Sequence, residues 1–163
     1  MRVQKRRRKE NKTDYMKRIK LLKSKCPRLC FRKTDTDLIS QYIESKEAQD
    51  KILFGLNSKH LIKYGWPKEA ERSLKSTPAS YLLGMLVGKK IIEKKLKNPI
   101  IDFGIAKITH RNTAFAFLNG LKDAGLKIEC NKENFPEEKR IKGEHMKNKI
   151  PFEKIKSQIE NKK

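Results

Sequence analysis

The stretch Thr77 to Ile105 reads TPASYLLGMLVGKKIIEKKLKNPIIDFGI and has the clearest structural pattern in the chain. Threonine followed by proline is typical of a helix start, because threonine caps free backbone amides and proline has no amide to leave unpaired. Apolar residues then recur at helical spacing until Asn98-Pro99 ends the pattern. The stretch predicts a helix over Pro78 to Lys97, followed by a short apolar strand over Ile100 to Ile105.

Two glycines, Gly84 and Gly88, lie four residues apart inside the expected helix. Each costs about 1 kcal/mol of helix propensity relative to alanine, so we expect something to approach that face of the helix closely. A strand of the sheet is the first candidate for this neighbour, and a nucleic-acid backbone is the second.

Upstream of this helix, the sequence predicts an antiparallel meander of three strands: Arg28 to Lys33, Leu38 to Glu44 and Lys51 to Leu56. The turn-rich run Thr34 to Asp37 separates the first two strands, and a polar break over Ser45 to Asp50 precedes the third. Ser58 is then expected to cap a helical turn ending near Tyr64-Gly65, and Trp66 to Ser76 to form a polar loop.

Downstream, Asn112 or Thr113 is expected to cap a second helix that runs through Ala124 and ends at Gly125. The order strand, strand, strand, helix, strand, helix predicts an α/β fold with a mixed sheet. Three meander strands and a crossover strand, Ile100 to Ile105, make up this sheet, and the helices lie on one face. The topology is ribonuclease-H-like, without the carboxylates that such nucleases carry.

The basic residues are concentrated at the N-terminus. Fifteen Lys and Arg stand against two acids in residues 1–33, in a chain whose net charge is +22. Charge at this density repels itself in the free protein and is neutralised by a polyanion that releases its counterions on contact. Nucleic acid is therefore the expected partner.

The length of 163 residues suits about one domain. We expect a basic RNA-binding arm and helix over 1-25, an α/β core over 26-130 and a charged C-terminal extension over 131-163. The chain has fewer hydrophobic and more charged residues than a typical globular protein, which suggests that part of it becomes ordered only on binding.

Within the arm, residues 1–12 have no apolar period and are expected to be unstructured in the free protein. Thr13 to Lys25 predicts a short basic helix, capped by Thr13 or Asp14. At the other end of the chain, a small amphipathic helix is expected around Phe152, Ile155 and Ile159.

Several classes of protein are excluded by the composition. No stretch approaches the roughly 20 apolar residues of a membrane span, and no signal-type apolar region follows the charged start. Three cysteines do not pair evenly, which favours a reducing, cytoplasmic compartment. A zinc site built on Cys26 and Cys30 is a weak hypothesis, and we expect no metal or cofactor, with Cys30 as a small core residue.

Catalytic groups are scarce. The first expected strand has no carboxylate, and Asp102 is a single acid on the fourth. The chain has no glycine-rich phosphate loop, and its histidines lie in unrelated segments without a nucleophile motif. The sequence therefore predicts a binding protein with no catalytic residues.

Aromatic side chains among the cations suit recognition of unpaired bases by stacking. About half of them are expected in the core, Phe31 and Phe54 first. Tyr15, in the basic helix, and Trp66, in the loop before Pro67, are the two candidates for stacking on RNA.

Several blocks then follow one another in an order that is specific to one family: Arg6 to Tyr15, Arg18 to Lys23, Pro27-Arg28-Leu29, Lys63 to Trp66, Ala79 to Gly84, Gly88-Lys89-Lys90, Asp123 to Leu126, Phe135-Pro136 and Gly143 to Met146. Together they resemble the universal large-subunit ribosomal protein L-eighteen family in its archaeal form. The resemblance covers roughly Arg6 to Met146.

The resemblance implies a structural constituent of the cytoplasmic ribosome. Members of the family bind 5S ribosomal RNA beside large-subunit ribosomal RNA and anchor it, with ribosomal protein L-five and other proteins, in the central protuberance. Carried over by position, the RNA-contact candidates are Arg6, Arg7, Arg8, Lys9, Tyr15, Arg18, Arg28, Arg32 and Lys33. The remaining RNA-contact candidates are three lysines of the same basic segment, Lys5, Lys12 and Lys23, and the stacking candidate Trp66.

The loop before the last core helix departs from the family pattern T-x-G-S-R-V-F, since this chain has Thr109-His110-Arg111-Asn112-Thr113-Ala114-Phe115. Threonine replaces the expected arginine at position 113, and Arg111 replaces a glycine, which predicts a changed loop shape. Thr109 and Arg111 are carried over as RNA-contact candidates. Lys147 to Lys163 has no counterpart and is expected to fold against RNA or a neighbouring protein, or to stay solvated.

Two other classes remain as alternatives. A nonspecific basic DNA or chromatin-type binder would use the arm on duplex DNA, but the basic helix lacks a helix-turn-helix partner. A membrane-surface protein would need more apolar surface than Tyr15, Ile19 and Leu22 supply. We therefore expect neither DNA nor membrane as a partner.

Overall fold

The computed structural model of the chain describes residues 3–47, 49–146 and 149–161. Parts of the expected arm (Met1, Arg2), of the polar break (Ala48) and of the C-terminal segment (Lys147, Asn148, Lys162, Lys163) lie outside the described residues. The helices are α1 (Arg6–Lys9), α2 (Tyr15–Lys23), α3 (Thr77–Glu93), α4 (Thr113–Asp123), α5 (Glu138–Lys142) and α6 (Phe152–Asn161). The strands are β1 (Arg28–Lys33), β2 (Leu38–Lys46), β3 (Gln49–Asn57) and β4 (Ile100–Asp102), and three 3-10 helices are η1 (Ser58–Tyr64), η2 (Lys68–Ser73) and η3 (Lys132–Asn134).

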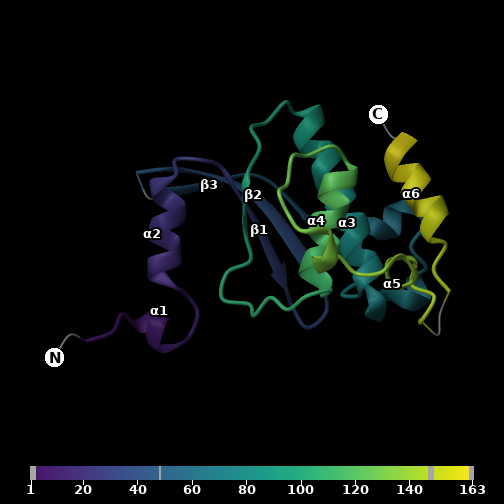
Figure 1. Cartoon of the computed structure of the whole chain (residues 1–163), viewed down its shortest axis with the longest axis horizontal. Helices are drawn as coiled ribbons and strands as arrows, with labels where there is room; N and C mark the ends of the chain where they lie inside the picture. Colours follow the sequence, from purple (N-terminus) through teal and green to yellow (C-terminus); the bar gives the residue numbers. More distant parts are fainter. Residues whose placement is uncertain (1–2, 48, 147–148, 162–163) are drawn as a thin grey trace.

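The sheet has the strand order β3-β2-β1-β4. Strand β1 is antiparallel to β2 and parallel to β4, so that Cys30 lies opposite both Gln41 and Asp102. This confirms the mixed α/β sheet with a crossover strand, and Figure 1 shows α3 and α4 together beside it. The expected polar break over Ser45 to Asp50 is wrong in extent, because the hairpin ladder continues to Lys46 and resumes at Gln49.

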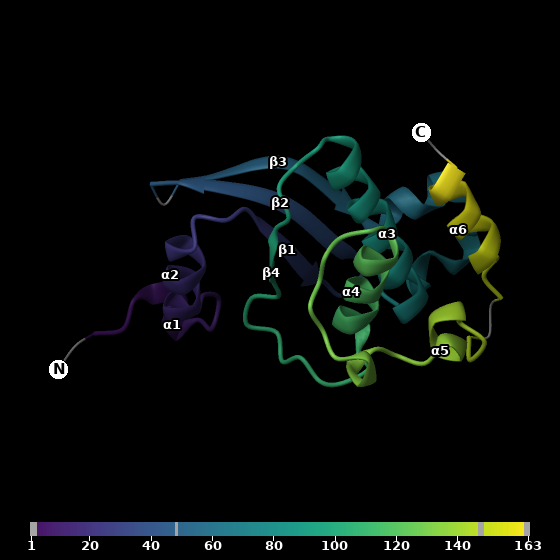
Figure 2. The same ribbon diagram turned by 45° about the horizontal axis from the view of Figure 1, so that its top comes forward.

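Strand alternation separates two faces of the sheet. Leu29 and Phe31 belong to the main core, where Phe31 packs on Phe117 of α4 with 4.5 Å between ring centroids. Arg28, Cys30 and Arg32 alternate with them and lie on the opposite face. Helix α2 covers part of this second face beneath the end of the β2–β3 hairpin (Figure 2).

Helix α3 runs through the centre of the molecule and is buried along most of its length. Its close neighbour is helix α4, not a strand as expected: a Cβ on Gly84 would lie 2.3 Å from the Phe117 carbonyl oxygen, and one on Gly120 would lie 2.0 Å from the Tyr81 oxygen. The glycines therefore allow two helix backbones to touch. The helix also ends before the expected Lys97, because Lys95 takes a left-handed φ of 50°.

The segment between β3 and α3 differs from the expected polar loop. Trp66, Ala70 and Leu74 are buried in the main core, and η2 lies between them. The charged residues between them, Lys68, Glu69, Glu71 and Arg72, are exposed, and a non-helical backbone at Ala70 interrupts η2. The preceding turn η1 begins after Asn57 rather than Ser58, and it ends, as expected, at Gly65 with φ of 90°.

The C-terminal segment also packs on the core. Phe152, Ile155 and Ile159 are buried, which confirms the amphipathic helix and rules out a fully solvated tail over the described part of Lys147 to Lys163. Figure 1 shows α6 at the end of the molecule farthest from α1. Within the part of the chain that the structure describes, no helix combines the length and apolar character of a membrane span.

Candidate nucleic-acid interface

The basic arm is ordered by its own side chains. Four of the residues expected to be unstructured form the turn α1, closed by the amides of Lys12 and Thr13, which donate to the Arg7 carbonyl oxygen at 2.8 and 3.2 Å. Arg7 Nε donates to Thr13 Oγ1 at 2.9 Å. Helix α2 then starts at Asp14, whose carboxylate accepts hydrogen bonds from the amides of Met16 and Lys17, as the cap expected from the sequence.

The inner side of α2 is attached by two cations. Lys17 Nζ donates to the Gly104 carbonyl oxygen at 3.0 Å, and Arg18 Nη2 contacts Asp50 Oδ2 at 2.9 Å. One bond reaches the loop after β4 and the other reaches the start of β3, so α2 is tied to both edges of the sheet. Arg18, an RNA candidate, is therefore already in an ion pair.

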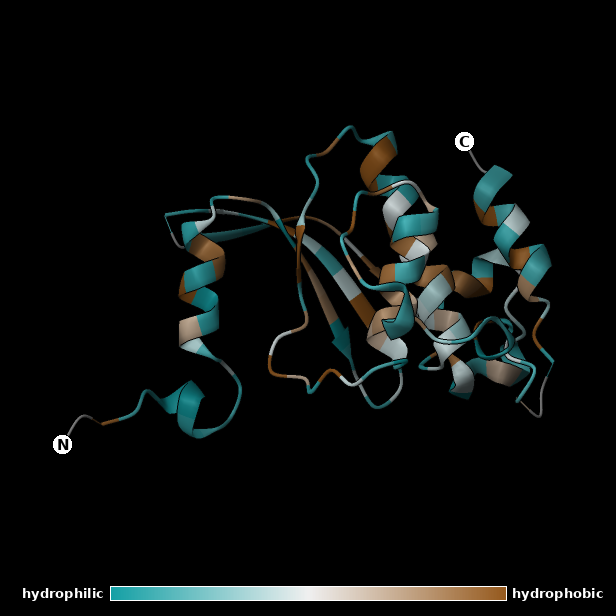
Figure 3. Ribbon diagram, viewed as in Figure 1, coloured by the Kyte–Doolittle hydropathy of each residue, from teal (hydrophilic) through white to brown (hydrophobic). Residues whose placement is uncertain are grey.

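The outer side of α2 and the turn α1 present cations to solvent. Lys20 and Lys23 are exposed on α2, beside the exposed Met16 and Ile19. Arg6 and Lys12 share Glu10, at 3.8 and 2.8 Å. Among the described residues, Arg8, Lys9, Lys20 and Lys23 have no carboxylate partner, and Figure 3 shows α1 in the hydrophilic colour.

Arg28 is buried in an ion pair within the protein, so its side chain is closed to solvent in this structure, and its contact with RNA stays a prediction. Its side chain is 3% exposed, and Nη2 donates to Asp50 Oδ1 at 2.7 Å and to Ser45 Oγ at 3.1 Å. Burial raises the pKa of the Asp50 carboxyl, but hydrogen bonds from Ser45 and Arg18 and the Arg28 charge outweigh it, and the pKa is held below its ordinary value.

Arg32 is held by Asp102 on the same face of the sheet. Its guanidinium donates to Asp102 Oδ2 at 3.0 Å and to the Asp102 carbonyl oxygen at 2.6 Å, while about half of the side chain remains exposed. Burial raises the pKa of Asp102, but the hydrogen bonds from the Gly104 amide and the Arg32 guanidinium lower it by more. The pKa of Asp102 is therefore below its ordinary value. Arg32 thus retains an open edge, whereas Arg28 is enclosed.

The two stacking candidates occupy different environments. Trp66 is 2% exposed, and its Nε1 donates to the Ala70 carbonyl oxygen at 3.1 Å. The enclosed ring has no face open for stacking in this structure, and the contact of Trp66 with RNA stays a prediction. Tyr15 is half-buried in the arm, with Lys5 Nζ 4.8 Å from its ring centroid, and its contact with RNA stays a prediction.

The loop before α4 turns at Arg111. Arg111 takes a left-handed φ of 57°, the region that favours glycine, and its amide donates to the Asn134 carbonyl oxygen at 2.9 Å. The change of loop shape relative to the family stays a prediction. The Arg111 guanidinium contacts Glu137 at 3.1 Å, and Thr109 is exposed.

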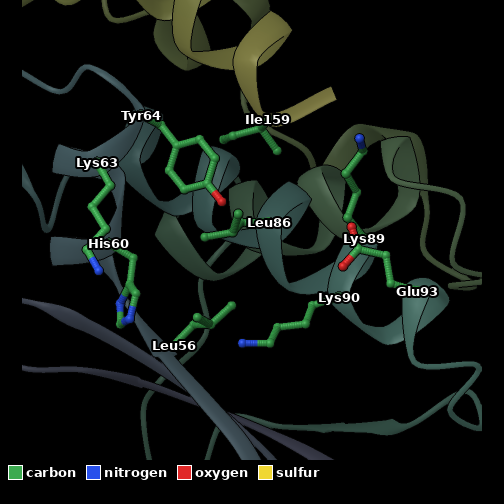
Figure 4. Close-up of a pocket in the computed structure, with 9 residues that line it drawn as sticks. All are labelled: Leu56, His60, Lys63, Tyr64, Leu86, Lys89, Lys90, Glu93 and Ile159. Carbon is green, nitrogen blue, oxygen red and sulfur yellow. The ribbon is translucent and has the colours of Figure 1, made fainter. Parts of the chain in front are cut away.

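A hollow of about 320 Å³ lies between η1, α3 and α6 (Figure 4). Tyr64 and Ile159 lie at one end, and Leu86 lies between them and Leu56. Two of its cations are engaged: Lys89 Nζ donates to the Glu160 carbonyl oxygen, and Lys90 Nζ lies 5.3 Å from the centroid of the Phe54 ring. This hollow is separate from the arm.

Metal and thiol chemistry find little support in the described part of the chain. It contains no group of three or more His, Cys, Asp or Glu side chains placed to hold a metal ion. Cys30 is buried, as expected, and donates to Asp102 Oδ2 at 3.5 Å. Burial, with the neighbouring Asp102 charge, raises the pKa of the Cys30 thiol to about 11, which keeps it protonated and unreactive.

The structure thus gathers most of the candidates at one end of the molecule: the arm cations, Tyr15, Arg32 and Lys33. The sequence analysis missed two cations there. Lys20 shares the outer side of α2 with Lys23, three residues away, which is a helical spacing visible in the sequence. Lys107 lies in an exposed loop between Ile105 and Ile108. A single cation among apolar loop residues is the sequence pattern that could have identified Lys107 as a candidate RNA contact.

Comparison with known proteins agrees with this geometry. A family model described as ribosomal large subunit proteins 60S L5 and 50S L18 matches residues 1–100. The large ribosomal subunit protein uL18 of Korarchaeum cryptofilum (strain OPF8) is 40% identical over 141 residues, which are 86% of this chain and 70% of that protein. This chain belongs to the L18 family of large-subunit ribosomal proteins.

Membership in the L18 family confirms the resemblance carried by the sequence blocks. L18 proteins are structural components of the large ribosomal subunit rather than enzymes, in agreement with the scarcity of catalytic groups noted from the sequence. The match over residues 1–100 includes the arm, the whole meander and α3, so the arm lies within the region by which this chain matches the family.

Proposed function

We propose that this chain binds 5S ribosomal RNA through its basic arm and anchors it in the central protuberance of the large subunit, together with ribosomal protein L-five. The observation that carries the proposal is the outward row of unpaired cations on α1 and α2: Arg8, Lys9, Lys20 and Lys23. Unpaired, exposed Lys and Arg at one end of a +22 chain suit phosphates, which supply most of the affinity in protein–nucleic acid contacts.

The attached arm supports a division of labour. Three cations donate hydrogen bonds within the protein: Lys17, Arg18 and Arg28. These bonds set the direction of α2 against the sheet. The outer cations then face the partner as a fixed array. Phosphate contacts of this kind position a protein on its RNA, whereas unpaired bases and the 2′-hydroxyl distinguish RNA from DNA.

The test is a binding comparison between 5S ribosomal RNA and a DNA duplex of equal length, across a series of salt concentrations. We expect a preference for the RNA that persists near physiological salt. Equal affinities that fall together as salt rises would leave only a nonspecific polycation and would restore the DNA-binding alternative.

Partnership with L-five has its own readout. The purified chain, 5S ribosomal RNA and L-five are expected to elute as one complex in gel filtration at near-physiological salt. Elution of L-five apart from a stable complex of this chain with the RNA would remove that partner and leave RNA binding intact.

A further inference from the structure

A hollow of about 440 Å³ lies beside the arm, between β1, the loop after β4 and the start of α4. We call it the Phe103 hollow. It is lined by Lys12, Phe31, Arg32, Lys33, Phe103, Gly104, Ile105, Ala106, Lys107, Ile108, Asn112, Thr113 and Ala114. Its volume falls in the range of about 300 to 1,000 Å³ of cavities that enclose small ligands.

The lining of the Phe103 hollow combines an apolar floor with a basic rim. Phe31 and Phe103 supply the floor, the exposed Ile105 and Ile108 add apolar surface, and the loop that carries residues 103 to 108 shows hydrophobic bands in Figure 3. Lys33 and Lys107 stand on the rim without a carboxylate partner among the described residues. Lys33 Nζ lies 3.5 Å from Thr113 Oγ1, so its charge remains available.

The absence of acid distinguishes this hollow from four others of the described surface. Glu93 lines the hollow of Figure 4, and Asp14 and Asp102 line the one between arm and sheet. The remaining two contain Asp123, Glu138, Glu153, Glu137 and Glu144. The Phe103 hollow has no Asp or Glu in its lining, so its charge complements an anion.

The wall of the hollow is held in place by a short network. The Gly104 amide donates to Asp102 Oδ1 at 2.8 Å, and its carbonyl oxygen accepts from Lys17 Nζ at 3.0 Å. Gly104 has φ of 67°, and a Cβ there would lie 2.9 Å from Arg32 Cζ. Phe103 packs edge-on against Phe31, with 5.9 Å between the ring centroids. The hollow is therefore preformed and shares Lys12 and Arg32 with the arm side of the molecule.

We propose that the Phe103 hollow is a subsite for one unpaired nucleotide of the bound RNA, whose base enters among Phe103, Ile105 and Ile108 and whose phosphates lie on Lys33 and Lys107. An apolar floor with a basic rim matches a nucleotide, which has a flat ring at one end and an anion at the other. The subsite rests on the proposed binding of 5S ribosomal RNA and specifies which feature of the RNA is read.

The first experiment locates the nucleotide. The full chain with p-benzoylphenylalanine in place of Ile105 is bound to 5S ribosomal RNA, irradiated, and the crosslinked nucleotide is mapped. Ile52 carries the same label as the control, because it is exposed to a similar extent, 51% against 49%, on β3. We expect one unpaired nucleotide from position 105 that position 52 does not label. Crosslinks confined to paired segments, or none despite binding, overturn the subsite.

The second experiment measures its contribution. The exposed residues Ile105 and Ile108 are replaced together (Ile105→Ala, Ile108→Ala), and binding is compared on intact RNA and on RNA made abasic at the mapped nucleotide. Loss of the apolar contacts with the base predicts about a fivefold or larger fall in affinity for the intact RNA, and less than about twofold for the abasic RNA. Equal losses on both RNAs would overturn the subsite while leaving the proposed function intact. Failure of the unmodified chain to bind 5S ribosomal RNA would overturn both.

Discussion

Arg28 of β1 donates a hydrogen bond to Asp50 of β3 at 2.7 Å, across the intervening strand β2. Asp50 also accepts from Arg18 of α2 at 2.9 Å, so one carboxylate joins the arm to the sheet. The relationship explains why a chain with so many cations keeps an acid at the tip of its hairpin. It separates the basic residues that build the protein from those left for a partner.

Removal of Arg28 tests the structural side of this division. Arg28→Ala removes a hydrogen bond between charged groups, but Asp50 is 28% exposed and keeps Arg18 and Ser45 as partners, so the cost is about 2 kcal/mol. We expect the free energy of unfolding in urea to fall by about that amount, while the salt dependence of RNA binding by the folded variant stays the same. A flatter salt dependence with unchanged stability would return Arg28 to the RNA interface.

The arm predicts the opposite result. Replacing Arg6, Arg7 and Arg8 together by alanine should leave stability nearly unchanged and reduce the slope of log affinity against log salt by about 2 to 3 units, if each contacts a phosphate. The matched control replaces Lys139, Arg140 and Lys154, which are exposed on α5 and α6 at the other end. Equal slopes for the two triple variants would remove the arm from the interface.

Trp66 is the only tryptophan of the chain and reports on the core. Its fluorescence should be that of an enclosed indole, resist quenching by acrylamide, and stay unchanged when RNA is added. Trp66→Ala should lower the free energy of unfolding by about 4 kcal/mol, because a large buried side chain is lost. Strong quenching by RNA in the native protein would show that the side chain reaches the interface.

The contact between α3 and α4 predicts an effect that runs against helix propensity. Gly84→Ala should gain about 1 kcal/mol of propensity but lose more to overpacking, because its Cβ would lie 2.3 Å from the Phe117 oxygen. We expect a net loss of about 1 to 2 kcal/mol in thermal or urea unfolding. Gly55→Ala is the control, since the nearest atom to its Cβ, Gln41 Cγ, lies 3.5 Å away, and this variant should be close to neutral.

The lowered pKa of Asp102 predicts that the free energy of unfolding depends on pH in the acid range. The pKa of its carboxyl is lowered in the folded chain, so its contribution is full above the unfolded value of about 3.9 and is lost as the pH falls through the folded pKa. Unfolding free energy measured from pH 6 down to about pH 2 should therefore fall in the acid range. Asp102→Asn should be less stable at pH 6 and should lose less on acidification. Parallel curves for the two proteins would contradict the assignment.

Local signals in the sequence anticipated much of the fold. Asn112 caps α4 and Gly125 follows its end, as a side-chain acceptor and a left-handed glycine do in any helix of this kind. The meander and its crossover strand follow from short apolar runs and their order. These features depend on neighbours along the chain, which is why the residues alone predicted them.

The sequence predicted the basic region of the candidate site, but it did not show which of its members are buried. Arg28 and Arg8 are alike in the sequence, yet the first is buried beside Asp50 and the second is exposed. Trp66 precedes a proline among polar residues, a pattern typical of a surface loop, but its side chain is buried and its Nε1 donates to the Ala70 carbonyl oxygen. A count of charges and aromatics cannot separate such cases, because burial depends on segments that come together only in three dimensions.

The sequence alone determined the family blocks and the order of the strands and helices, and it predicted nucleic acid as the partner, because charge density and local periodicity are properties of neighbouring residues. The tertiary structure decided which cations remain free, what lies against Gly84, and where an apolar hollow opens beside Lys33 and Lys107. Asp50 and Asp102 neutralise or position particular arginines only after β1, β3 and β4 are assembled beside α2. The physical reason is that ion pairing and burial act over a few ångströms of space, whatever the separation along the chain.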